Sequence, residues 1–160
     1  ISDVSGGQLD EQMFATIAEL QVPYVLMHMQ GTPETMQDAP EYVDVTEEVL
    51  SFFIQRLDTL RRIGVQDVIV DPGFGFGKSL EHNYQLLSDL DQFQVLGVPI
   101  LCGFSRKSMI NKVLGTSPEE ALNGTTVLNT LALLRGVNIL RVHDVKEASE
   151  AVKLTAALPA

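Results

Sequence analysis

The segment that most constrains the fold of this chain is residues 69–78, which have the sequence IVDPGFGFGK. Two β-branched residues followed by Asp71 predict the end of a strand, and glycine then occurs at every second position, at 73, 75 and 77. Glycine permits positive φ angles and a close approach of the backbone to a ligand. Because α/β folds bind ligands at the carboxyl ends of their strands, we expect Asp71 and this glycine loop to form part of a binding site.

The glycine loop does not match the two common nucleotide-binding signatures. A Walker A loop would need glycine where this chain has Pro72. The dinucleotide fingerprint would place its third glycine at Lys78 if it began at Gly73, and at Leu80 if it began at Gly75. The loop is therefore not predicted to bind a nucleotide phosphate.

Strand and helix patterns alternate along the whole chain. Short apolar runs predict strands at 23–29, 67–71, 98–103 and 137–143, and helical patterns predict helices at 10–20, 45–63, 82–92, 119–135 and 145–157. Helix starts are indicated by Pro118 and by capping-box spacing in the pairs Asp44 and Glu47, Ser117 and Glu120, and Asp144 and Glu147. Such alternation is typical of an α/β fold with a parallel sheet. This pattern alone fits two architectures: one half of an eight-stranded barrel, or a small open sheet.

The longest irregular segment runs from Gly31 to Val43 and contains Pro33 and Pro40. A loop of this length after a strand is typical of a functional segment, with a surface excursion as the alternative. The chain has no linker composition and no repeat of a solenoid period, so we treat it as part of one domain.

The composition fits a compact unit with an acidic surface. At 160 residues and 45% hydrophobic residues the chain can bury a core. Its formal charge of −10 and pI near 4.6 argue against nucleic acid and anionic membrane as partners, so an anionic substrate would need a local cluster of cations. Cys102, the one cysteine, lies in an apolar run and is interpreted as a buried small hydrophobe. The absence of a disulfide partner, of a signal-peptide pattern and of an apolar run long enough for a membrane span predicts a cytoplasmic protein.

Four motifs, in order along the chain, resemble dihydropteroate synthase, a family of pterin-binding enzymes. They are LMHMQGTP at 26–33, DPGFGFGKS at 71–79, GFSRKS at 103–108 and RVHDV at 141–145. The resemblance implies a TIM (β/α)8 barrel, of which this chain would be the C-terminal half. Residues 1–160 would form the C-terminal portion of a single pterin-binding barrel domain, with the N-terminal strands outside the chain. Residues 1–4 resemble the end of the fourth strand.

The resemblance also implies an activity. The family condenses 6-hydroxymethyl-7,8-dihydropterin diphosphate with p-aminobenzoate to give 7,8-dihydropteroate and diphosphate in folate biosynthesis, and it is a sulfonamide target. The family implies Mg²⁺ with its ligand in the N-terminal part, so no metal ligand is predicted here, and it suggests a homodimer. This chain alone is expected to be inactive. The alternatives are a pterin-binding methyltransferase on a related barrel and an inactive pterin-binding half barrel.

The motifs suggest roles for individual side chains. Asp71 is predicted to read the amino-pyrimidinone edge of the pterin, because one carboxylate fits two parallel N–H donors; a loop brace or surface aspartate is the alternative. Lys107 is predicted to donate to the pterin ring and to support charge at the reacting centre. Ser105 and Ser108 lie near the start of a short helix predicted to end at Leu114, where free amides favour an anion such as the p-aminobenzoate carboxylate. A plain helix cap explains Ser105 nearly as well.

Arg141 and His143 are predicted to bind the diphosphate. Residues two apart on a strand share a face, so both side chains would point to one side of the strand 137–143, while Leu140 and Val142 would point to the other. Two side chains that can carry positive charge at a strand end suit a diphosphate, and a salt bridge to a neighbouring acid is the alternative. Together with Lys107 they form the predicted catalytic set.

Four further residues are predicted to contact substrate. Gly103 ends the strand before the lysine motif, and Phe76 would cover the substrate from the glycine loop. Met27 is interpreted either as a flat apolar contact for the pterin ring or as ordinary core packing. Ser2 stands where the family usually has asparagine, so a pterin contact there would depend on one hydroxyl in place of an amide's separate donor and acceptor.

Three polar residues near these motifs receive other interpretations. His28 is predicted to be a hydrogen-bonded core histidine, and Arg106 a solvated basic residue. Lys78 matches the glycine-loop motif, but its role is less secure than that of Asp71.

Overall fold

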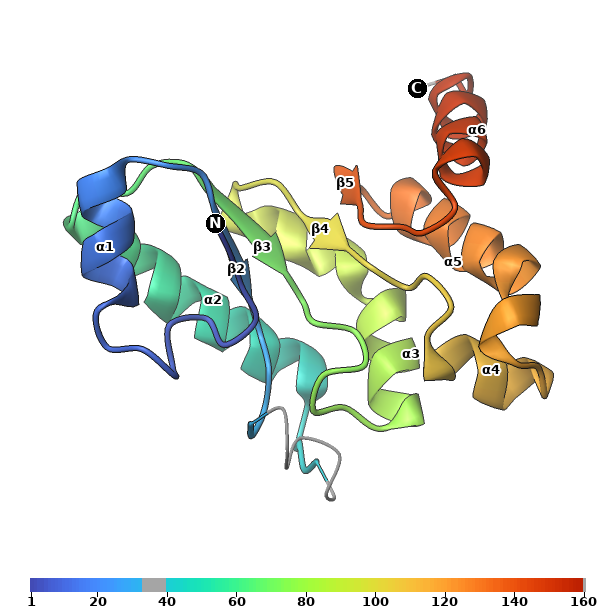
Figure 1. Cartoon of the computed structure of the whole chain (residues 1–160), viewed down its shortest axis with the longest axis horizontal. Coiled ribbons are helices and arrows are strands. Elements are labelled where there is room, and N and C mark those ends of the chain that lie inside the picture. The colour runs from blue at the N-terminus through green and yellow to red at the C-terminus, as the bar shows by residue number, and fades with distance from the viewer. Residues whose placement is uncertain (33–39, 160) are drawn as a thin grey trace.

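The structure is a computed structural model that describes residues 1–32 and 40–159. Strands β1 (Ser2–Asp3), β2 (Tyr24–Met27) and β3 (Val68–Asp71) form one parallel sheet in chain order, and β4 (Leu101–Cys102) pairs in parallel with β5 (Ile139–Leu140). A parallel bridge between Val70 and Ile100 joins the two sheets. The strands therefore follow one another across the molecule (Figure 1). The predicted α/β class with parallel strands is confirmed.

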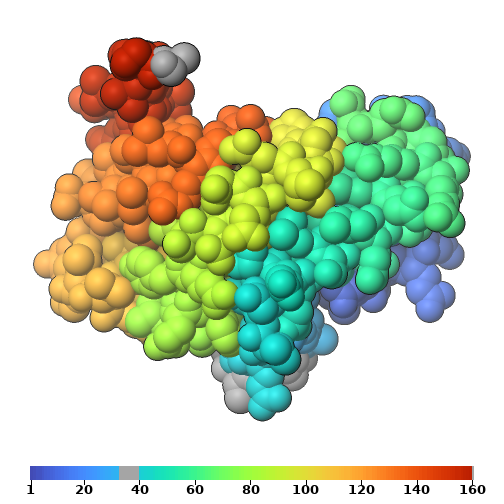
Figure 2. Space-filling model, turned by 180° about the vertical axis from the view of Figure 1, so that it is seen from behind, coloured from blue at the N-terminus to red at the C-terminus, as the bar shows by residue number. Residues whose placement is uncertain are grey.

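Helices pack against this strand array, and the segments coloured from teal to orange form the face seen from behind (Figure 2). They are α1 (Met13–Leu20), α2 (Val45–Arg62), α3 (Leu80–Ser88), α4 (Ser108–Leu114), α5 (Leu122–Leu134) and α6 (Val145–Ala156), with the 3-10 helices η1 (Leu90–Leu96) and η2 (Pro118–Glu120). Each predicted helix is present, but the one predicted at 82–92 is divided between α3 and η1. Within the described parts of the chain, no helix has both the length and the apolar composition needed to cross a membrane.

Helix α2 carries an apolar stripe that builds the core. Val49, Phe53, Leu57 and Leu60 recur three or four residues apart, and all are buried. The Phe53 ring meets Phe93 of η1 edge-on, with 6.1 Å between the ring centroids. The stripe shares one core cluster with the strand residues Leu26 and Val70, so α2 packs against the strand array.

The helix starts agree only in part with the predicted capping boxes. Ser117 and Glu120 form one as predicted. Asp44 caps α2 by accepting hydrogen bonds from the amides of Thr46 and Glu47, but the returning carboxylate belongs to Glu48. The box predicted for Asp144 is wrong, because this side chain makes no capping hydrogen bond and binds an arginine instead. A box that the sequence reading missed joins Ser79 and His82 at the start of α3.

The carboxyl ends of the strands meet at one edge of the array. Met27 pairs with Asp71 and Cys102 pairs with Leu140. The ladders continue for one step, since His28 N donates to Asp71 O over 3.0 Å and Arg141 N donates to Cys102 O over 2.8 Å. The segments that follow β3, β4 and β5 therefore leave the array at the same edge, where the sequence predicts the site.

Candidate functional site

A pocket of about 280 Å³ lies at the carboxyl ends of β3, β4 and β5. Its lining residues come from the three segments that follow these strands: Asp71, Phe76, Gly103, Ser105, Lys107, Arg141, Val142 and His143. All of them except Val142 belong to the predicted site. The fold therefore brings residues that are up to 72 positions apart in the sequence into one small polar pocket.

Asp71 is the buried acid of this pocket. Its side chain is 8% exposed, and one carboxylate oxygen accepts a hydrogen bond of 2.8 Å from Gly73 N. No other hydrogen bond reaches this carboxylate from the described residues. Burial raises the pKa of Asp71, while the Gly73 amide and the nearby ammonium groups of Lys107 and Lys78 lower it. A desolvated carboxylate with one oxygen unpaired can accept hydrogen bonds from a ligand.

The glycines after Asp71 are required chiefly by the protein's own backbone. Gly73, Gly75 and Gly77 have φ angles of 72°, 81° and 61°. A Cβ at Gly73 would overlap the carbonyl oxygen of His28, and a Cβ at Gly77 would overlap the backbone of Gln30. The expected close approach to a ligand is therefore, at these two positions, a close approach to the segment that follows β2.

Lys78 and His28 lie beneath this loop. Lys78 Nζ donates to the carbonyl oxygens of Gly73 and Phe76, both over 3.1 Å, and lies 3.0 Å from His28 Nδ1. Burial lowers the pKa of Lys78 to about 7, and burial together with the lysine charge lowers the pKa of His28 to about 2. His28 is thus the hydrogen-bonded core histidine that the sequence predicts.

Lys107 crosses the pocket from the segment after β4. Its Nζ donates to Phe74 O over 2.5 Å and lies 4.9 Å from the centroid of the Phe76 ring. Burial lowers the pKa of Lys107, Asp71 opposes that shift, and Arg141 adds to it. The Lys107 amine therefore lies near the carboxylate of Asp71 and the guanidinium of Arg141, with the ring of Phe76 beside it.

Arg141 and His143 both line the pocket, but the strand argument for them is wrong. β5 ends at Leu140, so both residues lie beyond the strand, and Val142 between them lines the pocket as well. Both side chains are exposed. Neither forms an ion pair with the described residues, so the salt-bridge alternative finds no support there.

Ser105 orients His143 and caps no helix. Its Oγ accepts a hydrogen bond of 3.2 Å from His143 N and lies 2.8 Å from His143 Nδ1. Helix α4 begins at Ser108 with Lys107 as its N-cap and without a capping side chain. The cap interpretation of Ser105 is therefore wrong, because the imidazole takes its hydroxyl.

Three predicted contacts lie outside the pocket. Ser2 is an exposed residue of β1, and the buried polar residue of this strand is its neighbour Asp3. Met27 is buried next to Gly73 but does not belong to the hydrophobic core cluster, so both of its interpretations stay predictions. Ser108 is exposed at the start of α4. Residues 33–39 of the loop from Gly31 to Val43 lie outside the described residues, so its predicted function is not tested.

Arg106 is a brace, and its interpretation as a solvated residue is wrong. Its guanidinium makes hydrogen bonds of 3.0 and 2.8 Å to the two carboxylate oxygens of Asp144, and it also donates to the carbonyls of Pro118 and Glu119. The bidentate pair lowers the pKa of Asp144. The brace joins the start of α6 to the segment that carries Lys107. Its residues are 38 positions apart, and no local sequence pattern indicates the pair.

Asn83 is a supporting residue that the sequence analysis missed. Its Oδ1 accepts a hydrogen bond of 2.7 Å from Gly75 N, and its amide donates to the carbonyls of Lys78 and Ser79. The start of α3 thereby holds the outer side of the glycine loop. The capping-box spacing of Ser79 and His82 was the signal that could have located this helix start.

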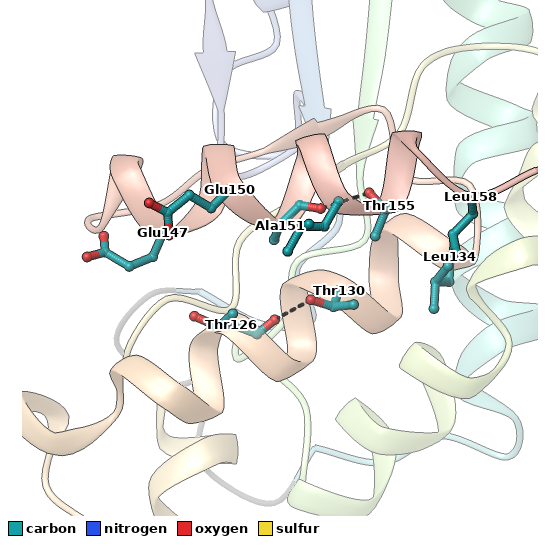
Figure 3. A pocket seen from close by; sticks show the side chains of 9 residues that line it. Thr126, Thr130, Leu134, Glu147, Glu150, Ala151, Thr155 and Leu158 are labelled. Carbon is teal, nitrogen blue, oxygen red and sulfur yellow. Dashed lines mark hydrogen bonds between the residues drawn. The ribbon is translucent and has the colours of Figure 1, made fainter.

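A second pocket, of about 370 Å³, lies between α5 and α6 (Figure 3). Its three threonine hydroxyls donate to carbonyls of their own helices, as Thr130 does to Thr126 O over 2.9 Å. Glu147 and Glu150 lie at one end, and Leu134 and Leu158 lie at the other. No predicted site residue lines it. The pocket at the strand ends therefore remains the candidate site.

The described residues offer no ready metal site. Among residues 1–32 and 40–159, no group of three or more histidine, cysteine, aspartate or glutamate side chains could hold a metal ion. The cations Lys107 and Arg141, with the imidazole of His143, instead suit an anionic ligand near Asp71.

Comparison with known proteins gives a consistent result. The family model described as "Pterin binding enzyme" matches residues 1–143. The dihydropteroate synthase of Escherichia coli is 46% identical over 142 residues, which are 88% of this chain and 50% of that protein. The Haemophilus influenzae enzyme is 41% identical over 156 residues, which are 96% of this chain and 56% of that protein. The chain thus spans about half the length of these curated relatives.

Solved structures of the same family superpose closely. A Yersinia pestis dihydropteroate synthase in complex with a sulfonamide drug has a TM-score of 0.94 at 38% identity, covering 98% of this chain and 58% of that chain. A Thermus thermophilus dihydropteroate synthase in complex with 4-aminobenzoate has a TM-score of 0.92 at 42% identity, covering 98% of this chain and 64% of that chain. The described strands and helices therefore have the arrangement found in part of those enzymes.

Proposed function

The chain belongs to the family of pterin-binding enzymes, and we propose that it is the C-terminal part of a dihydropteroate synthase. The proposed reaction joins the amine of p-aminobenzoate to the methylene carbon of 6-hydroxymethyl-7,8-dihydropterin diphosphate and releases diphosphate. The observation that carries the proposal is the pocket that combines the Asp71 carboxylate, which has one oxygen unpaired, with Lys107, Arg141 and His143. These groups provide an acceptor for the pterin and a cationic region for the leaving group.

In this proposal, residues 1–160 are the C-terminal portion of a single (β/α)8 barrel. Two observations support it: β1 and β5 are the edge strands of the described array, and the relatives extend well beyond the matched region. Open parallel edges are paired when a barrel closes. This chain and the N-terminal part that the relatives carry together form the complete barrel.

Asp71 is proposed to bind the pterin. A carboxylate accepts two parallel N–H donors, and the amino-pyrimidinone edge of a pterin presents such a pair. The short bond to Gly73 N leaves one oxygen unpaired and fixes the orientation of the group. Lys107, close enough to influence the pKa of Asp71, would donate to the ring from the same side.

Arg141 and His143 are proposed to hold the diphosphate. Both are exposed at the pocket, and the hydroxyl of Ser105 fixes the orientation of the imidazole. As the bond from the methylene carbon to the diphosphate breaks, negative charge accumulates on the leaving group, and preorganised donors stabilise it. The pterin ring can support the positive charge that develops on the methylene, so the reaction needs no covalent intermediate with the protein.

Mg²⁺ would assist this step by neutralising diphosphate charge. Since the described residues form no metal cluster, we propose that its ligand belongs to the N-terminal part of the barrel. Among the described residues, those proposed to act on the diphosphate are the guanidinium of Arg141, the imidazole of His143 and the ammonium of Lys107.

The acceptor p-aminobenzoate is proposed to lie beside Phe76 and Lys107. The ring of Phe76 provides an apolar surface next to the ammonium of Lys107, which can also attract a carboxylate. Gly103 and Ser105 complete the wall of the pocket. Neither Ser2 nor Ser108 lines the pocket. Either serine would contact a substrate only if its segment moved, or if the N-terminal strands of the complete barrel extended the pocket to it.

A pterin-binding methyltransferase is the second candidate, and an inactive half barrel is the third. A methyltransferase has no diphosphate to bind, so the cationic residues after β5 favour the synthase. A homodimer and a cytoplasmic location remain predictions from the sequence.

The proposal is tested by measuring dihydropteroate formation by the 160-residue chain alone, by the N-terminal part alone and by their mixture. We expect negligible turnover from each part and restored turnover from the mixture, because four or five strands cannot close a barrel. Full activity of the isolated chain would contradict the half-barrel proposal. A mixture that binds pterin without forming dihydropteroate would favour the inactive half barrel.

A further inference from the structure

One cation of the glycine-loop motif has no part in the chemistry proposed above. Lys78 is 4% exposed and does not line the pocket. Its Nζ instead contacts Gly73 O, Phe76 O and His28 Nδ1 at 3.1, 3.1 and 3.0 Å. We propose that Lys78 is a positioning residue, whose ammonium holds the glycine loop in the conformation that presents Asp71 and Phe76 to the pterin substrate. This inference rests on the proposed function.

The three contacts match the donor capacity of the ammonium. A protonated lysine has three N–H donors and no acceptor, and three acceptors lie within hydrogen-bond distance of Nζ. Two of them are carbonyls of the same tight turn, since Phe76 N donates to Gly73 O over 3.0 Å. The third, His28 Nδ1, belongs to the segment that follows β2. Lys78 thus joins both ends of the turn to the neighbouring strand.

The turn that Lys78 holds connects two pocket residues. Asp71 precedes it and accepts the hydrogen bond of Gly73 N, while Phe76 ends it and faces Lys107 Nζ at 4.9 Å. A shift of Gly73 or Phe76 would therefore change both the orientation of the Asp71 carboxylate and the position of the aromatic ring. Loss of geometry at this scale lowers affinity and rate even when no ligand contact is removed.

The hydrogen bonds also determine the proton arrangement beneath the loop. For the ammonium to donate to His28 Nδ1, that nitrogen must be unprotonated, so His28 is neutral with its proton on Nε2. Burial and the charge of Lys78 favour this state, because together they lower the pKa of His28 to about 2. The other charged groups acting on Lys78 are Asp71, which favours its protonated form, and Lys107, which opposes it. The pair carries one positive charge when Lys78 is protonated.

Stability alone does not explain a lysine at this position. Burial penalises the charged amine and lowers its pKa to about 7. Replacement of both partners of a buried ion pair by apolar side chains of similar volume is often neutral or stabilising, whereas removal of one partner alone is destabilising. A methionine at position 78 would fill a similar volume without the cost of desolvation, but it could not hold the carbonyls of Gly73 and Phe76. The contacts to these two carbonyls, which only a donor can make, are therefore the reason we assign Lys78 a positioning role.

The test compares Lys78→Met with Lys112→Met, a matched change of an exposed lysine on α4, both in the complete barrel. Calorimetry measures the affinity for 6-hydroxymethylpterin, which lacks the diphosphate, and ¹H–¹⁵N spectra report the amides of Gly73, Gly75 and Phe76. We expect Lys78→Met to weaken pterin binding about tenfold or more, in keeping with the loss of charge-assisted hydrogen bonds. Its loop amides should shift, and its unfolding midpoint should not rise, because Phe76 O and His28 Nδ1 lose their donor. Lys112→Met should match the parent in all three measurements.

A second variant keeps the inference testable if Lys78→Met does not fold. His28→Phe removes one acceptor of the ammonium and preserves a ring beside Phe52, so a smaller loss of affinity and smaller amide shifts are expected. Parent-like loop amides and pterin affinity in Lys78→Met, or in His28→Phe if only this variant folds, would overturn the inference. If the parent itself binds no pterin, the proposed function fails. Shifts of the loop amides in Lys78→Met would then still show that Lys78 holds the glycine loop, and unshifted amides would show that it does not.

Discussion

Ser105 and His143 are joined by two contacts across the pocket, although they are 38 residues apart. Ser105 Oγ accepts a hydrogen bond of 3.2 Å from His143 N and lies 2.8 Å from His143 Nδ1. A hydroxyl that already accepts from the amide can donate its own proton to Nδ1. With Nδ1 engaged by Ser105, Nε2 is the ring nitrogen that can donate to an anionic ligand. Ser105 thereby orients the imidazole that is proposed to bind the diphosphate.

Ser105→Ala should weaken the binding of pyrophosphate to the complete barrel by roughly 1 kcal/mol, the typical value of one neutral hydrogen bond. The imidazole would lose its orientation, while the phosphate-binding groups themselves remain. Calorimetry measures the affinity, and ¹⁵N chemical shifts of the ring report the tautomer. Ser51→Ala, a change of an exposed serine on α2, is the control. Unchanged affinity and tautomer in Ser105→Ala would mean that the backbone alone positions His143.

Asp71→Asn should weaken pterin binding by roughly 2 to 4 kcal/mol, since one charge-assisted acceptor becomes a donor facing a donor. The burial of Asp71 makes water a poor substitute for the lost interaction. Calorimetry with 6-hydroxymethylpterin isolates this contact from the diphosphate. Asp67→Asn changes an exposed aspartate just before β3 and should bind as the parent does. A parent-like dissociation constant for Asp71→Asn would show that Asp71 is only a brace for the glycine loop.

The sequence predicted the elements and most of the pocket because the relevant signals are local. Asp71, Gly103 and Arg141 stand at or just beyond strand ends, and parallel strands bring such positions to one edge. The motifs then distinguished Lys107 and Phe76 from ordinary loop residues. Apolar periodicity likewise located α2 without any information from contacts.

The remaining features depend on contacts between distant segments, which no local pattern specifies. Arg106 binds Asp144, so it is a brace, and Asp144 is no longer available as a helix cap. Ser105 binds His143 for the same reason and caps no helix. The overlap of a Gly73 side chain with the His28 carbonyl is equally invisible before β2 and β3 are placed side by side.

Gly73→Ala should destabilise the complete barrel and abolish pterin binding. The new Cβ would require a left-handed backbone at φ 72° and would overlap the carbonyl oxygen of His28, which cannot move without disturbing β2. Gly97→Ala is the matched control, because its φ of 65° is similar but nothing lies within 4 Å of its Cβ. The control should lose only the roughly 1 to 2 kcal/mol expected for a left-handed alanine. Urea unfolding measures the loss of stability in both variants. Equal losses for Gly73→Ala and Gly97→Ala would contradict the close approach of the Gly73 and His28 backbones.

The parent should gain stability with pH between about pH 7 and pH 10.5, relative to Lys78→Met. The pKa of Lys78 is lowered from 10.5 to about 7 in the folded state, so within this window the unfolded chain binds a proton that the folded chain does not. Stability rises with pH wherever the unfolded state binds more protons, here by up to about 1.4 kcal/mol per pH unit. Urea unfolding of both proteins at pH 7 and pH 9 measures the difference. A constant difference would mean that Lys78 stays protonated throughout.

Replacement of both Arg141 and His143 by alanine should weaken binding of the pterin diphosphate while leaving 6-hydroxymethylpterin bound almost normally. Both side chains line the pocket beyond β5, and neither is neutralised by an acid among the described residues. Each loss alone should be roughly 1.5 to 3 kcal/mol, the range for hydrogen bonds to charged groups. The two losses should not add, because both groups contact one ligand and either can partly compensate for the other.

Competition by free pyrophosphate provides the direct measurement for this pair. Pyrophosphate should displace the pterin diphosphate from the parent and lose that ability in the double variant, because its binding depends on the same two side chains. Lys112→Ala removes one cation outside the pocket and matches the loss of the formal charge of Arg141, since histidine is counted as neutral. Parent-like competition in the Arg141 and His143 variant would place the diphosphate elsewhere. Arg141 and His143 would then have no role in diphosphate binding. The methyltransferase alternative would gain support, because its substrate carries no diphosphate.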